Sequence, residues 1–372
     1  MKIAVIAHLK FPISQPYHGG LEMHTHILVE GLMAAGHDVT LFGRAESDER
    51  FTVVEPPLEA VTTGLGVDLF DDEPGYNHHF VNRFHSYMSI VQELQLGDFD
   101  IVHNNCLHFA PLAMAQTLSC PVVTVLHTPP FPSLLSGVLL AKSYLGNHFV
   151  AVSESLARTW SPHAPHCEVI HNGLRKSSWN FSPYAAPKTA VWCGRICPEK
   201  GPEHAIEAAR LAGYRLRMVG TVYDEEYFAR EIEPRLGDDV VFLGQLGHEE
   251  LSAEIGRASV GLFTSTWDEP FGLVLIEMLA CGTPVAAFDS GAVREILTDD
   301  CGTVVPVGDW VALADRLDAT ATLSRAACRA RAIQDFPVDN MIAAYERLYQ
   351  KLRKTVDRPV VSATPKALTD VA

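Results

Sequence analysis

Residues 260–288 read VGLFTSTWDEPFGLVLIEMLACGTPVAAF, and their pattern indicates the architecture of the chain. Its two apolar ends, residues 260–263 and 285–288, have the length and composition of buried strands. Residues 272–280 between them are mostly apolar and long enough for a helix. A strand, a helix and a second strand in this order are typical of a parallel sheet that is covered by helices.

The same alternation continues along the chain in both directions. We expect strands at residues 2–7, 37–42, 101–103, 122–126, 149–152 and 169–170, then at 190–193, 215–219 and 240–243, with helices at 21–35 and 203–212. A stretch with Pro, Ser and Ala at 175–187 separates the two series. The pattern predicts an α/β chain of two Rossmann-like, doubly wound domains that face a central cleft. A ligand is expected in this cleft, at the carboxyl ends of the strands.

Composition narrows the classes of function. The chain has 372 residues, of which 47% are hydrophobic and 20% charged, so it can bury two cores. Its 45 acidic residues against 29 Lys and Arg give a formal net charge of -16. This charge disfavours binding to nucleic acid and gives no general attraction to anionic lipid. An anionic ligand must therefore be held by a few local cations.

The cysteines and the apolar runs predict a cytoplasmic protein. None of the eight cysteines forms a CxxC pair, and several lie in apolar runs, so we expect buried free thiols and a reducing compartment. The first residues, MKIAVIAHLKF, have no small-residue cleavage site and are interpreted as a strand rather than a signal peptide. No apolar run approaches the ~20 residues of a membrane-spanning helix, which leaves at most a peripheral contact with the inner face of a membrane.

Two glutamates in this segment are separated by seven residues. Glu269 precedes Pro270, so it is expected in a loop just before the helix. Glu277 lies inside the apolar helix, where a buried carboxylate needs a hydrogen-bonding partner such as a ribose diol. The helix begins with backbone amides that would form an anion site, those of Phe271, Gly272 and Leu273. The alternative is that Glu277 pairs with an Arg or Lys and that Glu269 is an ordinary first-turn acid.

The segment EPFGLVLIEMLACGTPV, residues 269–285, resembles the E-x7-E signature of the retaining glycosyltransferases of family 4, which have the GT-B fold. The resemblance extends from Met1 to about Leu352 and is weakest at residues 46–82. It implies that Glu269 contacts the transferred sugar and that Glu277 holds the ribose of the nucleotide.

A second motif, CGRICPEKG at residues 193–201, follows the first strand of the second domain. Its guanidinium and ammonium groups, on Arg195 and Lys200, suit a diphosphate whose charge grows as the sugar departs. A solvated surface pair is the alternative. The segment is similar to the family pattern G-R-x-x-x-x-K-G, which implies that both cations bind the donor diphosphate.

Three further residues are assigned through the resemblance. His127 ends a strand at the point where the family has a histidine that contacts the donor sugar. Gly20, in the pair Gly19-Gly20, is similar to the glycine loop that faces the diphosphate. Leu246 lies in a turn that resembles the family's turn near the nucleotide base. The catalytic candidates are thus Glu269 and His127, and the remaining candidates bind the donor.

We predict no metal site and no cofactor. His24 and His26 point to different faces of a helix, and no carboxylate or Cys completes a set of ligands around them. Asp98-Phe99-Asp100 spells a D-x-D motif, but it precedes a strand and lies at the end away from the expected cleft.

The resemblance implies an acceptor domain at residues 1–182, completed by a C-terminal helix at 339–355, and a donor domain at 188–338. Residues 356–372 are predicted to be disordered. The expected reaction transfers a sugar from a nucleotide-diphosphate sugar, UDP first and GDP second, to a sugar, lipid-linked sugar or small molecule, as in the synthesis of cell-surface polysaccharides or glycoconjugates. The sequence assigns no acceptor and no oligomeric state.

Other classes of function remain open at this point. A non-catalytic nucleotide-sugar-binding module would keep the same cations, and a GT-B-type epimerase or phosphorylase would keep the same scaffold. An NAD-dependent dehydrogenase is disfavoured, because its phosphate loop should read G-x-G-x-x-G where this chain has Gly19-Gly20-Leu21-Glu22. Residues 131–140 are interpreted as an apolar packed loop, with contact to an acceptor or a membrane as the alternatives.

Overall fold

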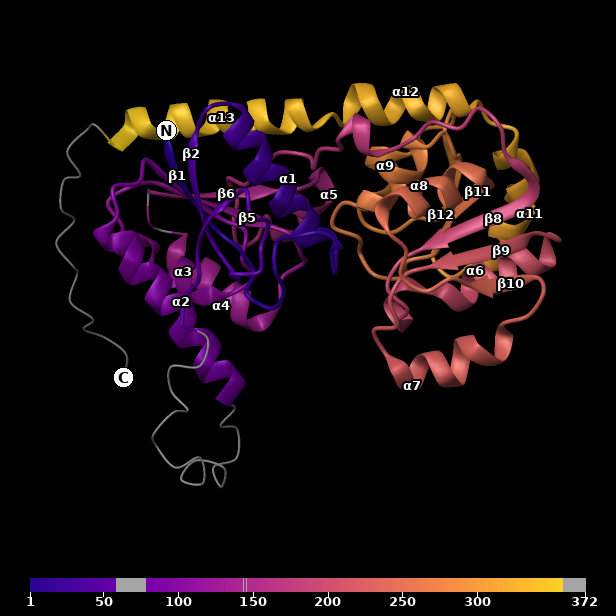
Figure 1. Cartoon of the computed structure of the whole chain (residues 1–372), viewed down its shortest axis with the longest axis horizontal. Helices are drawn as coiled ribbons and strands as arrows, with labels where there is room; N and C mark the ends of the chain where they lie inside the picture. Colours follow the sequence, from indigo (N-terminus) through magenta and orange to yellow (C-terminus); the bar gives the residue numbers. More distant parts are fainter. Residues whose placement is uncertain (58–77, 143, 145, 357–372) are drawn as a thin grey trace.

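The computed structural model of the chain has two lobes, each built on a parallel β-sheet (Figure 1). It describes residues 1–57, 78–142, 144 and 146–356. The two lobes lie side by side along the longest axis of the molecule (Figure 1). This architecture confirms the predicted fold class, the GT-B arrangement of two Rossmann-like domains.

The first sheet has the strand order β3-β2-β1-β4-β5-β6-β7, and all of its paired strands are parallel. Its strands are β1 (Lys2–Ile6), β2 (Asp38–Phe42), β3 (Thr52–Val54), β4 (Ile101–Asn104), β5 (Val122–Leu126), β6 (Asn147–Ala151) and β7 (Glu168–Val169). The order reverses between β1 and β4. The loops that leave the carboxyl ends of these two strands therefore diverge to opposite faces of the sheet, and ligands of such sheets bind at this switch point.

The second sheet repeats this arrangement with the order β10-β9-β8-β11-β12-β13. Its strands are β8 (Ala186–Cys193), β9 (Arg215–Val219), β10 (Val240–Phe242), β11 (Ala258–Phe263), β12 (Val285–Phe288) and β13 (Gly302–Val305). Its switch point lies between β8 and β11. The motifs that carry Lys200 and Glu269 follow these two strands, so the topology brings them to one place.

Helices cover both faces of each sheet (Figure 1). The first lobe has α1 (Gly20–Ala34), α2 (His78–Leu96), α3 (Phe109–Met114), α4 (Pro132–Ala141) and α5 (Glu154–Trp160). The second has α6 (Pro202–Leu211), α7 (Glu225–Tyr227), α8 (His248–Arg257), α9 (Leu273–Ala280), α10 (Val293–Ile296), α11 (Trp310–Ala321) and α12 (Arg325–Asp335). Shorter turns are η2 (Ala115–Thr117), η3 (Lys176–Ser178), η4 (Pro198–Lys200), η5 (Phe228–Ile232) and η6 (Glu233–Arg235).

The last described helix, α13 (Val338–Val356), returns to the first lobe (Figure 1). Its residues Tyr345 and Tyr349 are fully buried there. A methyl group added at Gly31 of α1 would lie 2.6 Å from the side chain of Ile342, which shows how closely the two helices approach. The helix predicted at residues 339–355 corresponds to α13, which packs on α1 and contributes to the core of the first lobe.

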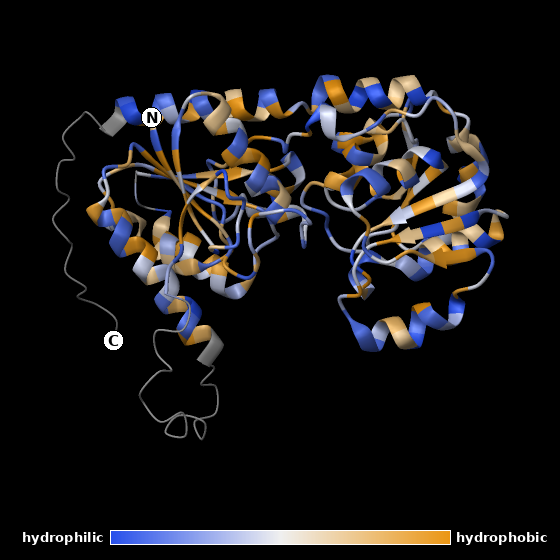
Figure 2. Cartoon of the chain, viewed as in Figure 1, coloured by the Kyte–Doolittle hydropathy of each residue, from blue (hydrophilic) through white to orange (hydrophobic). Residues whose placement is uncertain are grey.

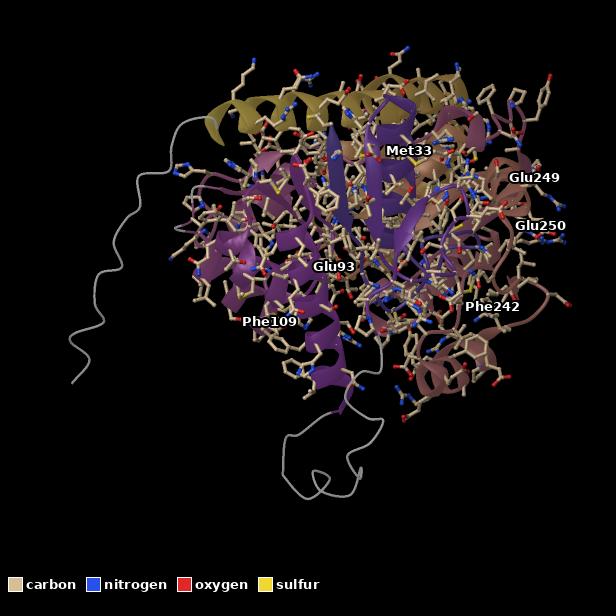
Figure 3. The ribbon with its side chains drawn as sticks, turned by 60° about the vertical axis from the view of Figure 1, so that its left-hand side comes forward. Met33, Glu93, Phe109, Phe242, Glu249 and Glu250 are labelled. Atoms are coloured by element: carbon tan, nitrogen blue, oxygen red, sulfur yellow. The ribbon has the colours of Figure 1, made fainter. Side chains whose placement is uncertain are left out.

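The apolar strands lie inside and the polar faces of the helices lie outside, as Figure 2 shows. Burial of these strands supplies the main driving force for folding. The surface is rich in acidic side chains, and Glu93, Glu249 and Glu250 are exposed on it (Figure 3). In the described part of the chain, no helix is both long enough and apolar enough to span a membrane.

Several elements differ from the sequence-based expectations. Residues 131–140 are not a loop, because Pro132–Ala141 form helix α4, whose Gly137 packs against Phe109. Strand β8 begins at Ala186, inside the expected linker 175–187. The predicted disordered tail, residues 356–372, lies outside the described residues except for Val356, which ends α13.

Candidate active site

The loop after β8 is fixed to the end of β11. Thr264, just after β11, accepts a hydrogen bond from Nε1 of Trp192 at 3.0 Å and donates to the carbonyl of Gly201 at 2.7 Å. Gly201 has φ +58, and a methyl group added there would lie 2.4 Å from the carbonyl oxygen of Thr264. Only glycine allows this close approach. The turn η4 therefore holds Lys200 rigidly at the switch point.

Lys200 and Glu269 form an ion pair there. Nζ of Lys200 lies 2.6 Å from Oε2 of Glu269, and both side chains are mostly buried. Ser265 donates a second hydrogen bond to Oε2 of Glu269 at 3.3 Å. Two of the predicted site residues, one from each motif, are thus in direct contact.

Gly291 holds the backbone of Glu269 from the other side. With φ +58, its Cα comes so close that an added methyl group would lie 2.1 Å from the carbonyl oxygen of Glu269. The amide of Ala292 donates to the same carbonyl oxygen at 3.0 Å. The position of the Glu269 carboxylate therefore depends on a glycine in the loop after β12, which the sequence analysis did not single out.

Helix α9 begins at this loop with unused backbone donors. Its N-cap, Gly272, has φ 89, a left-handed conformation that favours glycine. The amides of Phe271, Gly272 and Leu273 have no acceptor among the described residues. Phe271 itself is buried and contacts His171 and Phe336 through its ring. The start of α9 is thus anchored, and its amides are available for an anion.

Glu277 is buried in the second turn of α9, with an exposed fraction of 8%. No hydrogen bond or ion pair to its carboxylate occurs in the described part of the chain, so the predicted alternative of an Arg or Lys partner does not apply. Burial raises the pKa of Glu277 to about 8. A carboxylate in this position is costly unless a ligand supplies donors, and the hydroxyls of a ribose would do so.

Arg195 lies in the same loop as Lys200 but has other partners. Its guanidinium stacks over the ring of Tyr223, at 4.7 Å from the ring centroid, and lies 3.4 Å from Oε1 of Glu199. The ammonium of Lys10, from the first lobe, lies 5.6 Å from the centroid of the same ring. The structure thus separates Arg195 from the Lys200–Glu269 pair and brings it toward the first lobe.

Further contacts join residues of the first lobe to the loops of the second lobe. A methyl group added at Gly20 would lie 3.1 Å from Cδ1 of Leu273, so the glycine loop contacts the start of α9. Ser153 donates to the carbonyl of Pro270 at 2.6 Å, and Gln245 donates to that of Tyr17 at 3.2 Å. The carboxyl ends of both sheets therefore face each other. Leu246 follows Gln245 and is half-buried, with no partner that identifies its role.

His127 follows β5 and points into a cluster of buried polar side chains. Its Nε2 lies 2.9 Å from Oδ1 of Asn105, and its ring contacts that of His24 at 4.9 Å between centroids. Burial and the two neighbouring histidines, His24 and His103, hold the pKa of His127 well below its usual value. The imidazole is therefore neutral near pH 7. Asn105 was not among the predicted site residues.

Among the described residues, no group of three or more His, Cys, Asp or Glu side chains could hold a metal ion. The side chains of His24 and His26 point in different directions, as predicted. Nε2 of His26 lies 2.8 Å from Oδ2 of Asp48, whereas the ring of His24 packs on that of His127. Asp98 and Asp100 lie at the start of the first sheet and pair with Lys2 and Arg353. The D-x-D sequence is thus part of a strand entry.

Family models match both lobes of the chain. The family model described as "Glycosyltransferase Family 4" matches residues 18–177, and that described as "Glycosyl transferases group 1" matches residues 176–334. The phosphatidyl-myo-inositol mannosyltransferase of Mycobacterium leprae is 30% identical over 343 residues, which cover 86% of this chain and 87% of that protein. A glycogen synthase of Mycobacterium tuberculosis is 26% identical over 388 residues, or 92% and 93% of the two chains.

Solved structures show the same fold. Sucrose-phosphate synthase from Thermosynechococcus elongatus superposes with a TM-score of 0.73 at 21% identity, over 95% of this chain and 99% of that one. Anabaena HepE in complex with UDP-glucose superposes with a TM-score of 0.71 at 20% identity, over 95% and 100%. At these identities the similarity concerns the fold.

Proposed function

Since this chain belongs to the family 4 glycosyltransferases of the GT-B fold, we propose that it transfers a sugar from a nucleotide-diphosphate sugar with retention of anomeric configuration. The single observation that carries this proposal is the pairing of two features on α9. Its first amides have no acceptor among the described residues, and Glu277, further along the same helix, is buried without a partner there. A nucleoside diphosphate carries an anion and a ribose diol, which are the two kinds of group that these features would bind.

The roles of the residues follow from their charges. Lys200 and the amides of residues 271–273 stabilise the diphosphate, whose negative charge increases as the bond to the sugar breaks. Glu277 accepts hydrogen bonds from the ribose, and Glu269 from the sugar. His127 approaches the sugar from the first lobe. Arg195 would reach the diphosphate by leaving the ring of Tyr223. Gly20, which packs on Leu273, lets the backbone of the first lobe come near the leaving group.

UDP is the first choice of nucleotide and GDP the second. Anabaena HepE, a structural neighbour, binds UDP-glucose, which makes UDP the first probe to test. The acceptor is proposed to be a hydroxyl compound bound against the first lobe, either a sugar, a lipid-linked sugar or a small molecule. The mycobacterial relatives are a phosphatidyl-myo-inositol mannosyltransferase and a glycogen synthase, so both lipid-linked and carbohydrate acceptors belong in the screen.

The reaction is proposed to need no metal, because Lys200 and the helix amides supply the positive charge at the diphosphate. Undiminished activity in the presence of EDTA is the expected result. A cytoplasmic enzyme, at most peripheral to the inner face of the membrane, is proposed as well. All eight cysteines are free thiols, which agrees with a reducing compartment.

The deciding experiment separates binding from turnover. UDP, GDP and ADP are screened by thermal shift with the wild type and with Glu277→Leu, and nucleotide-sugar hydrolysis is then measured with the wild type and with Glu269→Ala. We expect one nucleotide to stabilise the wild type and not Glu277→Leu, and hydrolysis to be lost in Glu269→Ala. Undiminished turnover by a folded Glu269→Ala protein would contradict the proposal.

The same experiment distinguishes the rival functions. A binding module would be stabilised by a nucleotide but would hydrolyse no donor and glycosylate no acceptor. An epimerase would convert the nucleotide sugar to its epimer without an acceptor, and a phosphorylase would depend on phosphate. Chromatography of the products separates these outcomes.

A further inference from the structure

A chain of buried polar side chains connects His127 to the crossing helix α13. His127 and His103 each place Nε2 near the same oxygen, Oδ1 of Asn105, at 2.9 Å and 3.0 Å. On its other side, Nδ1 of His103 lies 2.6 Å from the hydroxyl of Tyr349. His103, Asn105 and Tyr349 are fully buried, so no bulk water competes for these bonds.

The orientation of the Asn105 amide follows from Thr25. The hydroxyl of Thr25 donates to the carbonyl of Leu21 at 2.8 Å, so its oxygen is left to accept from Nδ2 of Asn105 at 3.3 Å. The carbonyl oxygen of the amide must then face the two histidines. A carbonyl oxygen can only accept hydrogen bonds, and it has two lone pairs. Nε2 of His127 and Nε2 of His103 therefore both carry the proton.

The protonation of the two Nδ1 atoms then follows. His103 carries its proton on Nε2, so its Nδ1 accepts from the hydroxyl of Tyr349. His127 carries its proton on Nε2, so its Nδ1 has a free lone pair. No hydrogen bond from a described residue reaches this atom. The lowered pKa of His127 agrees with a neutral ring, which can have only one protonated nitrogen.

We infer that Asn105 and Thr25 are positioning residues that fix the tautomer of His127, so that Nδ1 of His127 accepts a hydrogen bond from a hydroxyl of the donor sugar. The part that concerns the sugar rests on the proposed function, whereas the tautomer does not.

Helix α13 supplies a matched control one turn away. Tyr345 packs its ring on His103 at 4.9 Å between centroids, as Tyr349 does at 6.1 Å. The hydroxyl of Tyr345 is buried and has no partner among the described residues. Tyr349→Phe removes a hydroxyl that donates to His103, and Tyr345→Phe removes an equally buried hydroxyl for which the described chain offers no hydrogen bond. Neither change alters the bonds that Asn105 makes with Thr25 and His127. Both variants keep the aromatic packing.

The test is the tautomer of His127, read from long-range 1H–15N spectra of histidine-labelled protein at pH 7 and assigned with His127→Gln. We expect the wild type and Tyr345→Phe to show the proton on Nε2. In Asn105→Leu and in Thr25→Val we expect a mixture of tautomers. A wild-type His127 with its proton on Nδ1 would overturn the inference even if no variant folds, and so would an unchanged His127 spectrum in a folded Asn105→Leu protein.

Kinetics adds a readout that a merely structural role would not give. In nucleotide-sugar hydrolysis, Asn105→Leu is expected to lower kcat about three- to tenfold, the value of one hydrogen bond, while the affinity for UDP stays the same and Tyr345→Phe changes neither. Equal loss of UDP affinity in both variants would show a structural effect and contradict the inference. If the wild type turns over no nucleotide sugar, the proposed function fails, and the tautomer experiment still gives its own answer.

Discussion

Nζ of Lys200 lies 2.6 Å from Oε2 of Glu269, so the residue expected to hold the diphosphate is paired with the residue expected to hold the sugar. The two come from different loops, after β8 and β11, and the switch point of the sheet brings them together. An ammonium has three donors and can bind a carboxylate and a phosphate at once. The carboxylate nevertheless lowers the positive charge that a diphosphate meets.

A first prediction concerns this pair. Glu269→Gln removes the negative charge, so UDP without a sugar is expected to bind several-fold tighter, while transfer falls by about 100-fold because the charged contact with the sugar is lost. Lys200→Met is expected to weaken UDP binding by about tenfold or more. Calorimetric titration with UDP and a transfer assay measure the two effects. Weaker binding of UDP to Glu269→Gln would show that the carboxylate does not compete with the diphosphate.

A second prediction concerns pH and the carboxyl of Glu277. Burial raises its pKa from 4.5 to about 8, so the folded protein keeps a proton that the unfolded chain releases. The contribution of this group to stability is complete below pH 4.5 and is lost as the pH rises to about 8. Glu277→Gln carries no such charge. The unfolding free energy of the variant minus that of the wild type should therefore increase by roughly 1–3 kcal/mol from pH 5 to pH 8.

Urea unfolding at the two pH values measures this difference. The Glu277→Gln variant should also show a smaller stabilisation by UDP than the wild type, since an amide oxygen accepts weaker hydrogen bonds from the ribose hydroxyls than a carboxylate does. Parallel stability curves of the two proteins across this range would mean that Glu277 titrates normally.

A third prediction concerns the loop that holds Glu269. An added methyl group at Gly291 would collide with the backbone of Glu269, so Gly291→Ala is expected to displace the carboxylate and abolish most of the transfer activity. Gly308 is a matched control. It also has a positive φ, +81, but no atom lies within 4 Å of the added methyl group. Gly308→Ala should cost only the backbone strain, about 1 kcal/mol, and keep its kcat. Equal kcat values for the two variants would refute this role of Gly291.

A fourth prediction concerns a contact between the lobes. The carboxylate of Glu295, on α10, accepts hydrogen bonds from the amides of Glu154 and Ser155 at 2.8 Å and 2.6 Å and lies 3.3 Å from Nε2 of His171. Glu295→Ala leaves these amides at the start of α5 without an acceptor, and their hydrogen exchange should become faster by about tenfold. Glu249→Ala, on the exposed face of α8 (Figure 3), should leave their exchange unchanged. Slow exchange in Glu295→Ala would show that other contacts hold the lobes.

Strands that are buried on both faces could be predicted from the sequence, because they are continuous apolar runs. Strand β5, Val122–Leu126, was predicted with the bounds it has. The edge strand β3 was not, since Thr52–Val54 is short and only partly buried. Helix α4 was taken for a loop because it follows two prolines and contains Gly137. Its helical form depends on tertiary packing, with Gly137 against Phe109, which a local pattern does not contain.

Some residues of the candidate site could be predicted from the sequence, and others could not. Glu269, Glu277 and Lys200 lie in long motifs, so a resemblance could assign them roles. Asn105 and Gly291 act through contacts with residues distant in sequence, on His127 and on Glu269. A single asparagine after a strand or a single glycine in a loop is common in any α/β protein. Only the three-dimensional contacts distinguish these two from the others.

The crossing helix has a consequence for biosynthesis. Tyr345, Tyr349 and Leu352 belong to the hydrophobic core of the first lobe, although they are among the last described residues. During translation, the first half of the chain leaves the ribosome well before these side chains exist. The hydrophobic core of the first lobe is therefore incomplete, with an uncovered apolar groove beside α1, until the second lobe has been synthesised and α13 leaves the ribosome. Folding from the amino terminus, one lobe after the other, is incompatible with this connectivity.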